Sequence, residues 1–239
     1  MSVAFECISR TDVGLRRKVN EDSMLVRTDR GLWAVADGMG GHDKGDVASA
    51  MVTEALLRIP IVYGLDNLLE AAVAALSQVN RELIALAGSD DSSRTIGSTV
   101  VGLAIANQQF RCFWAGDSRA YRVRDGQIVQ LSRDHSLVQD LVDAGMLTPQ
   151  EADSHPNANV ITRAVGVAAD LKIETVSGDA RPGDLFLLAS DGLTRLVNDA
   201  ELATELATKS PADAAESLVA AALARGAPDN VTMVIIKVT

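Results

Sequence analysis

Aromatic, histidine and cysteine residues are scarce in this sequence. Among its 239 residues, eight are aromatic, three are histidine and two are cysteine. With so few rings, the core must be built mainly from Ala, Val, Leu and Ile. Cys7 and Cys112 both lie in strand-like stretches, where we expect small buried thiols in a reducing compartment rather than a disulfide.

Long apolar runs are also missing. No uncharged apolar run is long enough to cross a bilayer, which takes about 18 residues or more. The first residues, MSVAFECISRTD, lack a basic start followed by an apolar stretch, so no signal peptide is expected. We therefore expect a cytoplasmic protein that does not associate with membranes.

Basic residues are outnumbered by acidic ones. There are 22 Lys and Arg against 32 Asp and Glu, which gives a net charge of −10. This balance argues against a nucleic-acid partner, which would need a basic surface, and against an anionic membrane. The acids comprise 22 aspartates and 10 glutamates. Because Asp is typical of turns, helix N-caps and strand ends, part of this acidity is expected in loops that hold cations.

The strand pattern predicts a layered protein with one domain over residues 1–239. No low-complexity linker divides the chain, and Pro and Gly are dispersed. Short apolar runs bounded by turn residues predict strands over 3–9, 23–28, 31–36, 98–106, 109–115, 119–124, 127–131, 171–177, 184–189 and 231–238. Asp125-Gly126 predicts a two-residue hairpin turn, since such turns need positive φ at both positions.

Capping residues and helical spacing predict the helices. They are expected over 46–58, 65–88, 135–144, from Thr148, over 198–207 and over 210–226. The polar stretch 132–166 interrupts the strand pattern and is predicted to be an inserted flap of helical pieces. Many antiparallel strands with helices in pairs favour a layered α+β fold over an alternating βαβ one.

Two strand-like segments run directly into Asp-Gly, at Asp37-Gly38 and at Asp191-Gly192. A carboxylate at the rim of a rigid strand lies at a fixed distance from a cation. The glycine lets the backbone turn so that its carbonyl also points inward. A single Asp-Gly after a strand is most often only a turn, so further residues are needed for a metal site.

Two more aspartates lie next to predicted strands and could complete a metal site. Asp229 directly precedes the last strand, and Asp117 closes another apolar strand. If the last strand runs antiparallel to those ending at Asp37 and Asp191, these three carboxylates share one edge of the sheet. Four aspartates without a Cys or His partner indicate hard oxygen coordination of Mg²⁺ or Mn²⁺ rather than structural zinc.

A basic and acidic segment, Arg17–Ser23, precedes the second strand. The planar fork of Arg17 suits bidentate binding of phosphate. Glu21 and Asp22 could orient metal-bound water. Taken alone, such a segment is usually a solvated loop.

Six short motifs occur in a characteristic order along the chain. They are RxxNED (17–22), DGMGGH (37–42), GST (97–99), GDSRAY (116–121), ASDG (189–192) and PDNVT (228–232). In this order they resemble the bacterial metal-dependent PP2C-type (PPM) serine/threonine phosphatases, from about residue 10 to 238. The resemblance implies a four-layer α/β/β/α sandwich of two antiparallel sheets flanked by helix pairs, with metals at one end and a flap subdomain at about 132–166.

The resemblance also implies a set of metal ligands. Asp37 would bridge two metal ions, and Gly38 would offer its backbone carbonyl. Asp191 and Asp229 would complete the first site, and Glu21 would act on the second through water.

Further roles are implied around these ligands. Asp22 and Asn230 would position the ligands without binding a metal ion themselves. Arg17 would hold the substrate phosphate. Asp117, together with Asp191, would hold a third, weaker metal ion.

The general acid is the least defined part of the expected site. Eukaryotic relatives carry a histidine directly after Asp-Gly, where this chain has Met39. His42 is the obvious substitute, and its alternative role is to orient the loop. His135 and His155 are expected to be flap residues rather than catalysts.

The implied reaction is hydrolysis of phosphoserine and phosphothreonine. A water shared by two divalent ions, Mn²⁺ or Mg²⁺, would attack phosphorus directly, without a phosphoenzyme. The implied partners are phosphoproteins, those of a bacterial Ser/Thr kinase, and the protein is expected to be a monomer.

Three other functions would each account for part of the sequence pattern. A pseudophosphatase that only binds partners would have lost metal carboxylates, yet Asp37, Asp191 and Asp229 are all present. A hydrolase of small phosphoesters would share the site and differ only in the lid. Ser118 in GDSRA faintly resembles a nucleophile elbow, but an elbow must enter a helix and this one enters a predicted hairpin.

Overall fold

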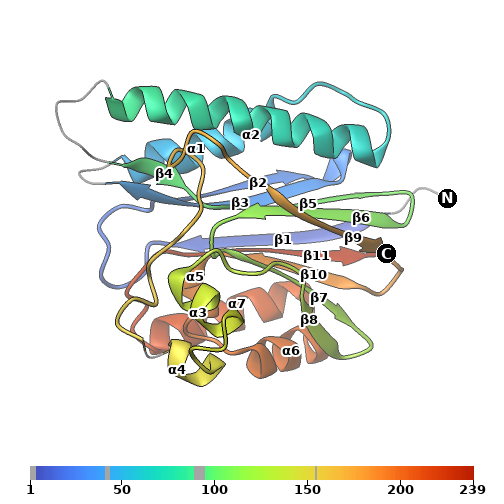
Figure 1. Cartoon of the computed structure of the whole chain (residues 1–239). Coiled ribbons are helices and arrows are strands. Elements are labelled where there is room, and N and C mark those ends of the chain that lie inside the picture. The colour runs from blue at the N-terminus through green and yellow to red at the C-terminus, as the bar shows by residue number, and fades with distance from the viewer. Residues whose placement is uncertain (1–3, 41–43, 89–94, 154) are drawn as a thin grey trace.

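The computed structural model describes residues 4–40, 44–88, 95–153 and 155–239, and its strands form two antiparallel sheets (Figure 1). The five-stranded sheet has the order β1 (Phe5–Asp12), β11 (Val231–Val238), β10 (Leu185–Ala189), β7 (Arg119–Arg124) and β8 (Gln127–Gln130). The six-stranded sheet has the order β2 (Asp22–Arg27), β3 (Leu32–Gly40), β5 (Val100–Ala106), β6 (Gln109–Ala115) and β9 (Glu174–Asp179), with β4 (Ile96–Ser98) paired to β3.

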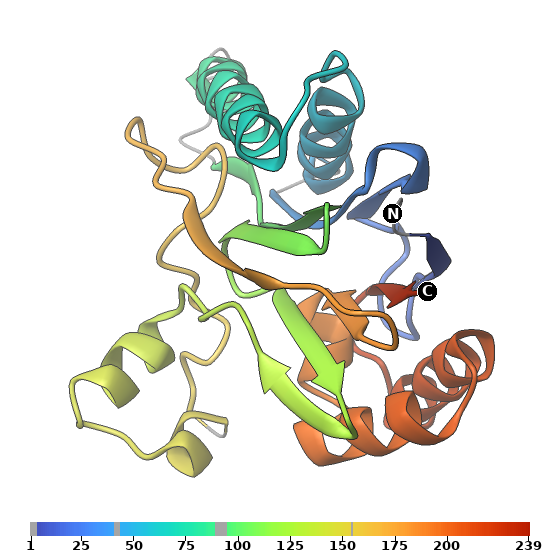
Figure 2. The ribbon, with the colours of Figure 1, turned by 90° about the vertical axis from the view of Figure 1, so that its right-hand side faces the viewer.

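Helix pairs cover the outer faces of the two sheets. Figure 1 shows α1 (Gly45–Leu57) and α2 (Leu65–Gly88) over the six-stranded sheet, and α6 (Asp199–Thr208) and α7 (Pro211–Ala224) below the five-stranded one. The short helix α5 (Asp191–Thr194) follows β10, and a 3₁₀ turn (Thr28–Arg30) joins β2 to β3. Helices α3 (Leu137–Asp143) and α4 (Pro149–Asp153) lie to one side of the layers (Figure 2).

Alternation along the strands creates three apolar layers. In β10, Phe186 and Leu188 face the core between the sheets, whereas Leu187 and Ala189 face the core under α6 and α7. In β3, Trp33 likewise lies between the sheets, while its neighbours pack toward α1 and α2. Side chains alternate between the faces of a strand, so strands covered on both faces are apolar throughout.

Local signals mark several elements as predicted. Asp125 and Gly126 have φ of 51° and 75°, and they form the turn between β7 and β8. Thr148 and Glu151 form the expected capping box, in which the Thr148 backbone N–H donates to Glu151 Oε2 at 2.8 Å. The four-layer sandwich expected from the motifs is therefore the observed arrangement.

Several predictions of elements need correction: the strand expected over 3–9 is β1, which ends at Asp12, and the strand expected over 31–36 is β3, which ends at Gly40. The strand expected over 98–106 is two strands, β4 and β5, which keep one register along β3 but are separated at Thr99, where Asp37 N–H donates to the Thr99 hydroxyl. The strand expected over 171–177 begins later and ends at Asp179. Helix α5 was not expected, since a helix of four residues is too short to show a period.

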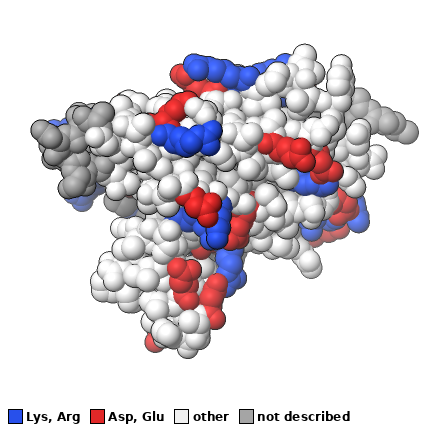
Figure 3. All heavy atoms as spheres, turned by 45° about the horizontal axis from the view of Figure 1, so that its top comes forward, with Lys and Arg blue, Asp and Glu red and all other residues white. Residues whose placement is uncertain are grey.

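Acidic and basic side chains are interspersed on the face in Figure 3 and form no basic stripe there. Among the described helices, none has the length and apolarity that a bilayer crossing requires.

Candidate active site

Acidic residues from both sheets meet at one end of the sandwich. Asp37 belongs to β3 of the six-stranded sheet, whereas Asp191 and Asp229 adjoin β10 and β11 of the five-stranded sheet. Strand β11 is antiparallel to β10, as expected. The expectation that the three carboxylates share one sheet edge was wrong. Asp37 and Asp191 belong to two different sheets that pack together, and their side chains interact between them.

Asp37 lies inside β3 rather than at its end. There β3 changes partner, since Leu32–Val35 pair with β5 and Gly38–Gly40 pair with β4. The backbone N–H of Asp37 donates to Thr99 Oγ1 at 3.0 Å, and its carbonyl accepts from Thr99 N–H at 2.8 Å and Ser98 Oγ at 3.0 Å. The GST motif therefore clamps the backbone of Asp37.

Gly38 allows three backbone segments to approach one another. A β-carbon there would collide with the carbonyl of Gly45 and come within 2.6 Å of the Glu21 carbonyl. Gly38 N–H donates to that Glu21 carbonyl at 3.0 Å, and the Glu21 side chain accepts from the Gly45 backbone. The role of Gly45 was not predicted, because this glycine carries no signal until α1 is placed against β3.

Gly192 has a similar function on the other sheet. A β-carbon at this position would collide with the carbonyl of Asn230. The absence of a side chain lets α5, which begins at Asp191, lie directly against the segment that carries Asp229. This close approach explains why glycine follows Asp191.

Arg17 connects two of the expected ligands. Its Nη2 lies 2.7 Å from Asp229 Oδ2, and its Nη1 lies 3.2 Å from Glu21 Oε2. The Arg17 side chain is 45% exposed, so it reaches solvent at the edge of the site. A cation at this position suits an anionic substrate.

Asp22 lies deeper than its neighbours in the motif. Burial, with nearby Asp191 and Asp229, raises the pKa of Asp22 to about 7, although hydrogen bonds from Thr232 and Ser190 oppose this. Ser190 Oγ donates to Asp22 Oδ2 at 2.8 Å. Because Ser190 directly precedes Asp191, Asp22 positions the start of α5.

The carboxylates repel one another in their buried setting. Burial raises the pKa of Asp37 well above its usual range, and the charges of Asp191, Asp22, Asp117 and Asp229 raise it further. Burial likewise raises the pKa of Asp191, although Arg195 opposes the shift. Buried carboxylates that raise one another's pKa are stabilised by cations, so this donor set fits divalent ions.

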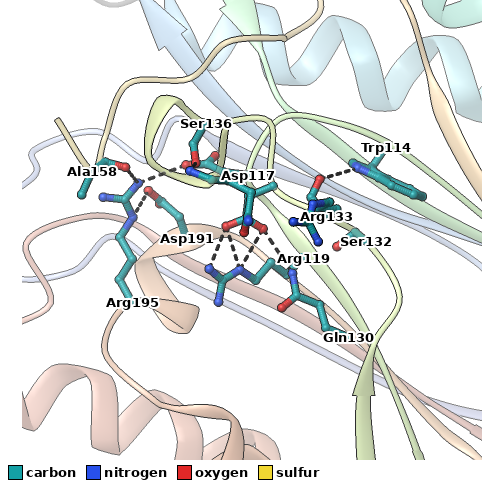
Figure 4. Close-up of polar contacts among 12 residues, drawn as sticks. Trp114, Asp117, Arg119, Gln130, Ser132, Arg133, Ser136, Ala158, Asp191 and Arg195 are labelled. Carbon is teal, nitrogen blue, oxygen red and sulfur yellow. Dashed lines mark hydrogen bonds and ion pairs between the residues drawn. The ribbon is translucent and has the colours of Figure 1, made fainter. Parts of the chain in front are cut away.

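Asp117 contacts a cation that sequence analysis did not single out. It is 3% exposed, and its Oδ2 lies 3.0 Å from Nη2 of Arg195, whose Nε lies 2.8 Å from Asp191 Oδ2 (Figure 4). The other carboxylate oxygen, Asp117 Oδ1, is buried and has no hydrogen-bond partner among the described residues. Within that part of the chain, no three His, Cys, Asp or Glu side chains form a ready-made metal cage, and arginines bridge the carboxylates.

A cleft of about 910 Å³ opens beside Asp117 and Asp191. It lies between the α3–α4 region, β7 and β8, and α5 and α6. Its polar walls include Asp134, Ser136 and Asn198. The cleft is large enough for several residues of a peptide next to the acidic centre.

The structure describes two of the three histidines, His135 and His155. His42 lies outside the described residues. His135 is buried, stacks on Trp114, and accepts a hydrogen bond at Nδ1 from Gly116 N–H at 3.1 Å. His155 Nδ1 accepts from the backbone N–H of Asn157 at 3.1 Å. Both described histidines therefore support loops.

Ser118 has the surroundings of a structural residue. It is 1% exposed, and its Oγ lies 2.8 Å from Thr99 Oγ1. Strand β7 follows it directly, so the strand-to-helix turn of a nucleophile elbow is not formed.

Comparison with known proteins identifies the family. The sequence pattern of the protein phosphatase 2C family matches residues 16–225. The chain is 35% identical to the protein phosphatase PhpP of Streptococcus pneumoniae over 232 residues, which cover 95% of this chain and 94% of PhpP. It is 38% identical to the serine/threonine protein phosphatase PstP of Mycobacterium tuberculosis over 95% of this chain, but it spans only 44% of that longer protein.

Solved structures agree over the whole chain. PppA of Pseudomonas aeruginosa superposes with a TM-score of 0.92 at 43% identity, covering 100% of both chains. The catalytic domain of PstP in complex with two manganese ions has a TM-score of 0.88 at 35% identity, again covering 100% of both. The predicted fold and family are confirmed, and this chain belongs to the protein phosphatase 2C family.

Proposed function

We propose that this protein is a serine/threonine protein phosphatase that uses two divalent ions, Mn²⁺ or Mg²⁺. The observation that carries the proposal is the close approach of the half-buried side chains of Asp37 and Asp191, with Gly38 packed too tightly for a side chain. The relatives PhpP and PstP are named as protein phosphatases, and a PstP structure contains two manganese ions. These names support the same activity here.

The proposed ligands are those that the motifs imply. Asp37 would contact both ions, Gly38 would offer its carbonyl, and Asp191 and Asp229 would complete the first ion's ligands. Glu21 would act on the second ion through water. Once bound, the ions would activate water for attack on phosphorus and neutralise the charge of the phosphoryl oxygens.

The remaining residues position substrate and ligands. Arg17 would bind the phosphate through its exposed guanidinium, after exchanging its contact with Asp229 for the substrate. Asp22 would hold Asp191 in place through Ser190, and Asn230 would hold the segment that carries Glu21. We assign proton donation to the leaving Ser or Thr oxygen to His42, on the basis of the motif alone.

The proposal extends to the biological setting. We infer a monomeric cytoplasmic enzyme with one domain over 1–239, in which residues 132–166 form a flap. Its substrates would be phosphoproteins made by a Ser/Thr kinase of the same cell. The cleft beside Asp117 and Asp191 supports a peptide substrate over a small phosphoester because of its size.

Metal-dependent hydrolysis of p-nitrophenyl phosphate and of a phosphothreonine peptide tests the proposal. Asp37→Asn and Asp191→Asn should lower turnover about 1000-fold or more, because a metal ion contributes several kcal/mol to stabilisation of the transition state. Asp170→Asn is the matched control, since Asp170 is exposed and lies outside the six motifs. Turnover near the parent level in either site variant would contradict the assignment, and tight Mn²⁺ binding without hydrolysis in the parent would favour a pseudophosphatase.

A further inference from the structure

Arg195 joins three separate parts of the molecule through one planar group. Its Nε lies 2.8 Å from Asp191 Oδ2, and its Nη2 lies 3.0 Å from Asp117 Oδ2. The same Nη2 donates to the backbone carbonyl of Ala158 at 3.2 Å. Figure 4 shows the guanidinium between these three acceptors.

Local structure explains why this arginine reaches both carboxylates. Arg195 is the C-terminal cap of α5 and lies four residues after Asp191, so both side chains lie on the same face of this single turn. Asp117 comes from the loop between β6 and β7 and faces them across the end of the five-stranded sheet. A fork of fixed geometry can bind one oxygen of each carboxylate.

The two carboxylates require a cation between them. Asp117 is 3% exposed, and the side chain of Asp191 is 18% exposed, so solvent screens their repulsion poorly. The guanidinium of Arg195 provides one positive charge at this position. Residues Asp117 and Asp191 are the same pair that the motifs imply as ligands of a third metal ion.

We propose that Arg195 takes the place of that third divalent ion, so that this chain binds two ions and uses Asp117 to anchor Arg195. An ion held by both carboxylates would have to displace the guanidinium from the two oxygens it contacts. The inference rests on the proposed function, because it concerns the number of ions at that site.

The contact with Ala158 gives the guanidinium a second role. Ala158 belongs to the segment 132–166 and lines the cleft beside Asp117 and Asp191. Arg195 therefore ties this wall of the cleft to the acidic centre. Loss of the guanidinium should both free the carboxylate pair and release the segment around Ala158.

Calorimetric titration with Mn²⁺ of the metal-free full chain tests the proposal. The parent should bind two ions, and Arg195→Ala should bind a third, weaker ion. The double variant Arg195→Ala/Asp117→Asn should return to two ions, because the third would depend on Asp117. Arg225→Ala is the matched control and should keep two ions, since this other cleft arginine pairs with Glu201 at 2.8 Å.

Hydrogen exchange gives an independent readout. Backbone amides near Ala158 should exchange faster in Arg195→Ala than in the parent, and Arg225→Ala should leave them unchanged. Arg195→Gln replaces Arg195→Ala in both experiments if the alanine variant does not fold, because it keeps a donor without the charge.

The outcomes separate the two proposals. Three ions in the parent, or two in the folded Arg195→Ala variant, would overturn the role of Arg195 and leave the proposed phosphatase intact. A parent that binds no Mn²⁺ would overturn the proposed function and this inference together.

Discussion

The side chain of Asn230 accepts a hydrogen bond from the backbone N–H of Glu21, with Oδ1 and N 2.8 Å apart. Its Nδ2 donates to the carbonyls of Val13 and Val19, at 2.9 Å and 3.1 Å. Asn230 is 2% exposed, and the three hydrogen bonds of this buried side chain attach the segment 13–21 to the start of β11. The Asn230 side chain therefore holds Arg17 and Glu21 beside Asp229.

Asn230→Ala should destabilise the protein and weaken metal binding. Loss of three buried hydrogen bonds at about 1 kcal/mol each predicts a fall of about 3 kcal/mol in the free energy of unfolding. Mn²⁺ affinity should fall about 10–100-fold, the usual effect of removing a residue that orients a ligand. Urea unfolding and Mn²⁺ titration measure the two effects.

The control for Asn230→Ala is Asn67→Ala. Asn67 is exposed, and its Nδ2 donates to the Tyr63 carbonyl near the start of α2. Its removal should change neither quantity measurably. Parental Mn²⁺ affinity in Asn230→Ala would show that the position of Glu21 does not depend on this side chain.

Arg17→Ala should raise KM for a phosphopeptide about 10–100-fold, because charge-assisted hydrogen bonds contribute about 1.5–3 kcal/mol. Mn²⁺ affinity should change far less, and Arg17→Lys should give an intermediate KM because its ammonium lacks the planar fork. Steady-state kinetics at saturating metal measures this effect. The exposed neighbour Arg16 supplies the control variant Arg16→Ala, and equal KM in parent and Arg17→Ala would remove Arg17 from the phosphate site.

Metal binding should stabilise the folded chain. At a Mn²⁺ concentration of about 100 times the dissociation constant, linkage predicts about 2.7 kcal/mol of added stability. For a chain of this length that corresponds to a rise of about 5–10 °C in Tm. Scanning calorimetry with and without Mn²⁺ measures the shift.

Asp37→Asn is the informative variant for that experiment. Without metal it should melt above the parent, since burial and four neighbouring carboxylates disfavour the charge of Asp37. With metal it should gain little. A parental Tm indifferent to Mn²⁺ and Mg²⁺ would count against the whole metal assignment.

The contribution of His135 to stability should decrease in mild acid. Burial and Arg163 lower the pKa of His135 despite the opposing charge of Glu174, and its Nδ1 accepts from Gly116 N–H. Above about pH 6.5 the ring is neutral in both folded and unfolded chains, so its contribution is complete. As the pH falls below that value, the unfolded chain binds the proton first, and stability is lost.

Unfolding free energies at pH 7.5 and pH 5 measure this loss. Between pH 7.5 and pH 5, His135→Gln should lose less stability, or gain more, than the parent. His155→Gln is the control, because His155 accepts only a local hydrogen bond from Asn157. An unchanged difference in His135→Gln would assign the acid sensitivity to other groups.

Local patterns accounted for much of the fold. Alternation predicted the buried strands, and Asp125-Gly126 and Thr148-Pro149 marked a turn and a helix start, because these signals act over two to four residues. Strand ends were less accurate. Thr99 separates β4 from β5 because its hydroxyl accepts a hydrogen bond from the backbone N–H of Asp37, which is 62 residues away.

The same distinction holds for the site. The sequence by itself determined the chemistry, since the order of its Asp-Gly, Asp-Asn and Arg motifs predicted the family, the acidic residues and the metal type. Only the tertiary structure decided which groups meet: Asp37 and Asp191 across two sheets, Gly45 against Glu21, and Arg195 between Asp117 and Asp191. These contacts depend on how the sheets and α5 pack, and packing between distant segments leaves no periodic signal in a single sequence.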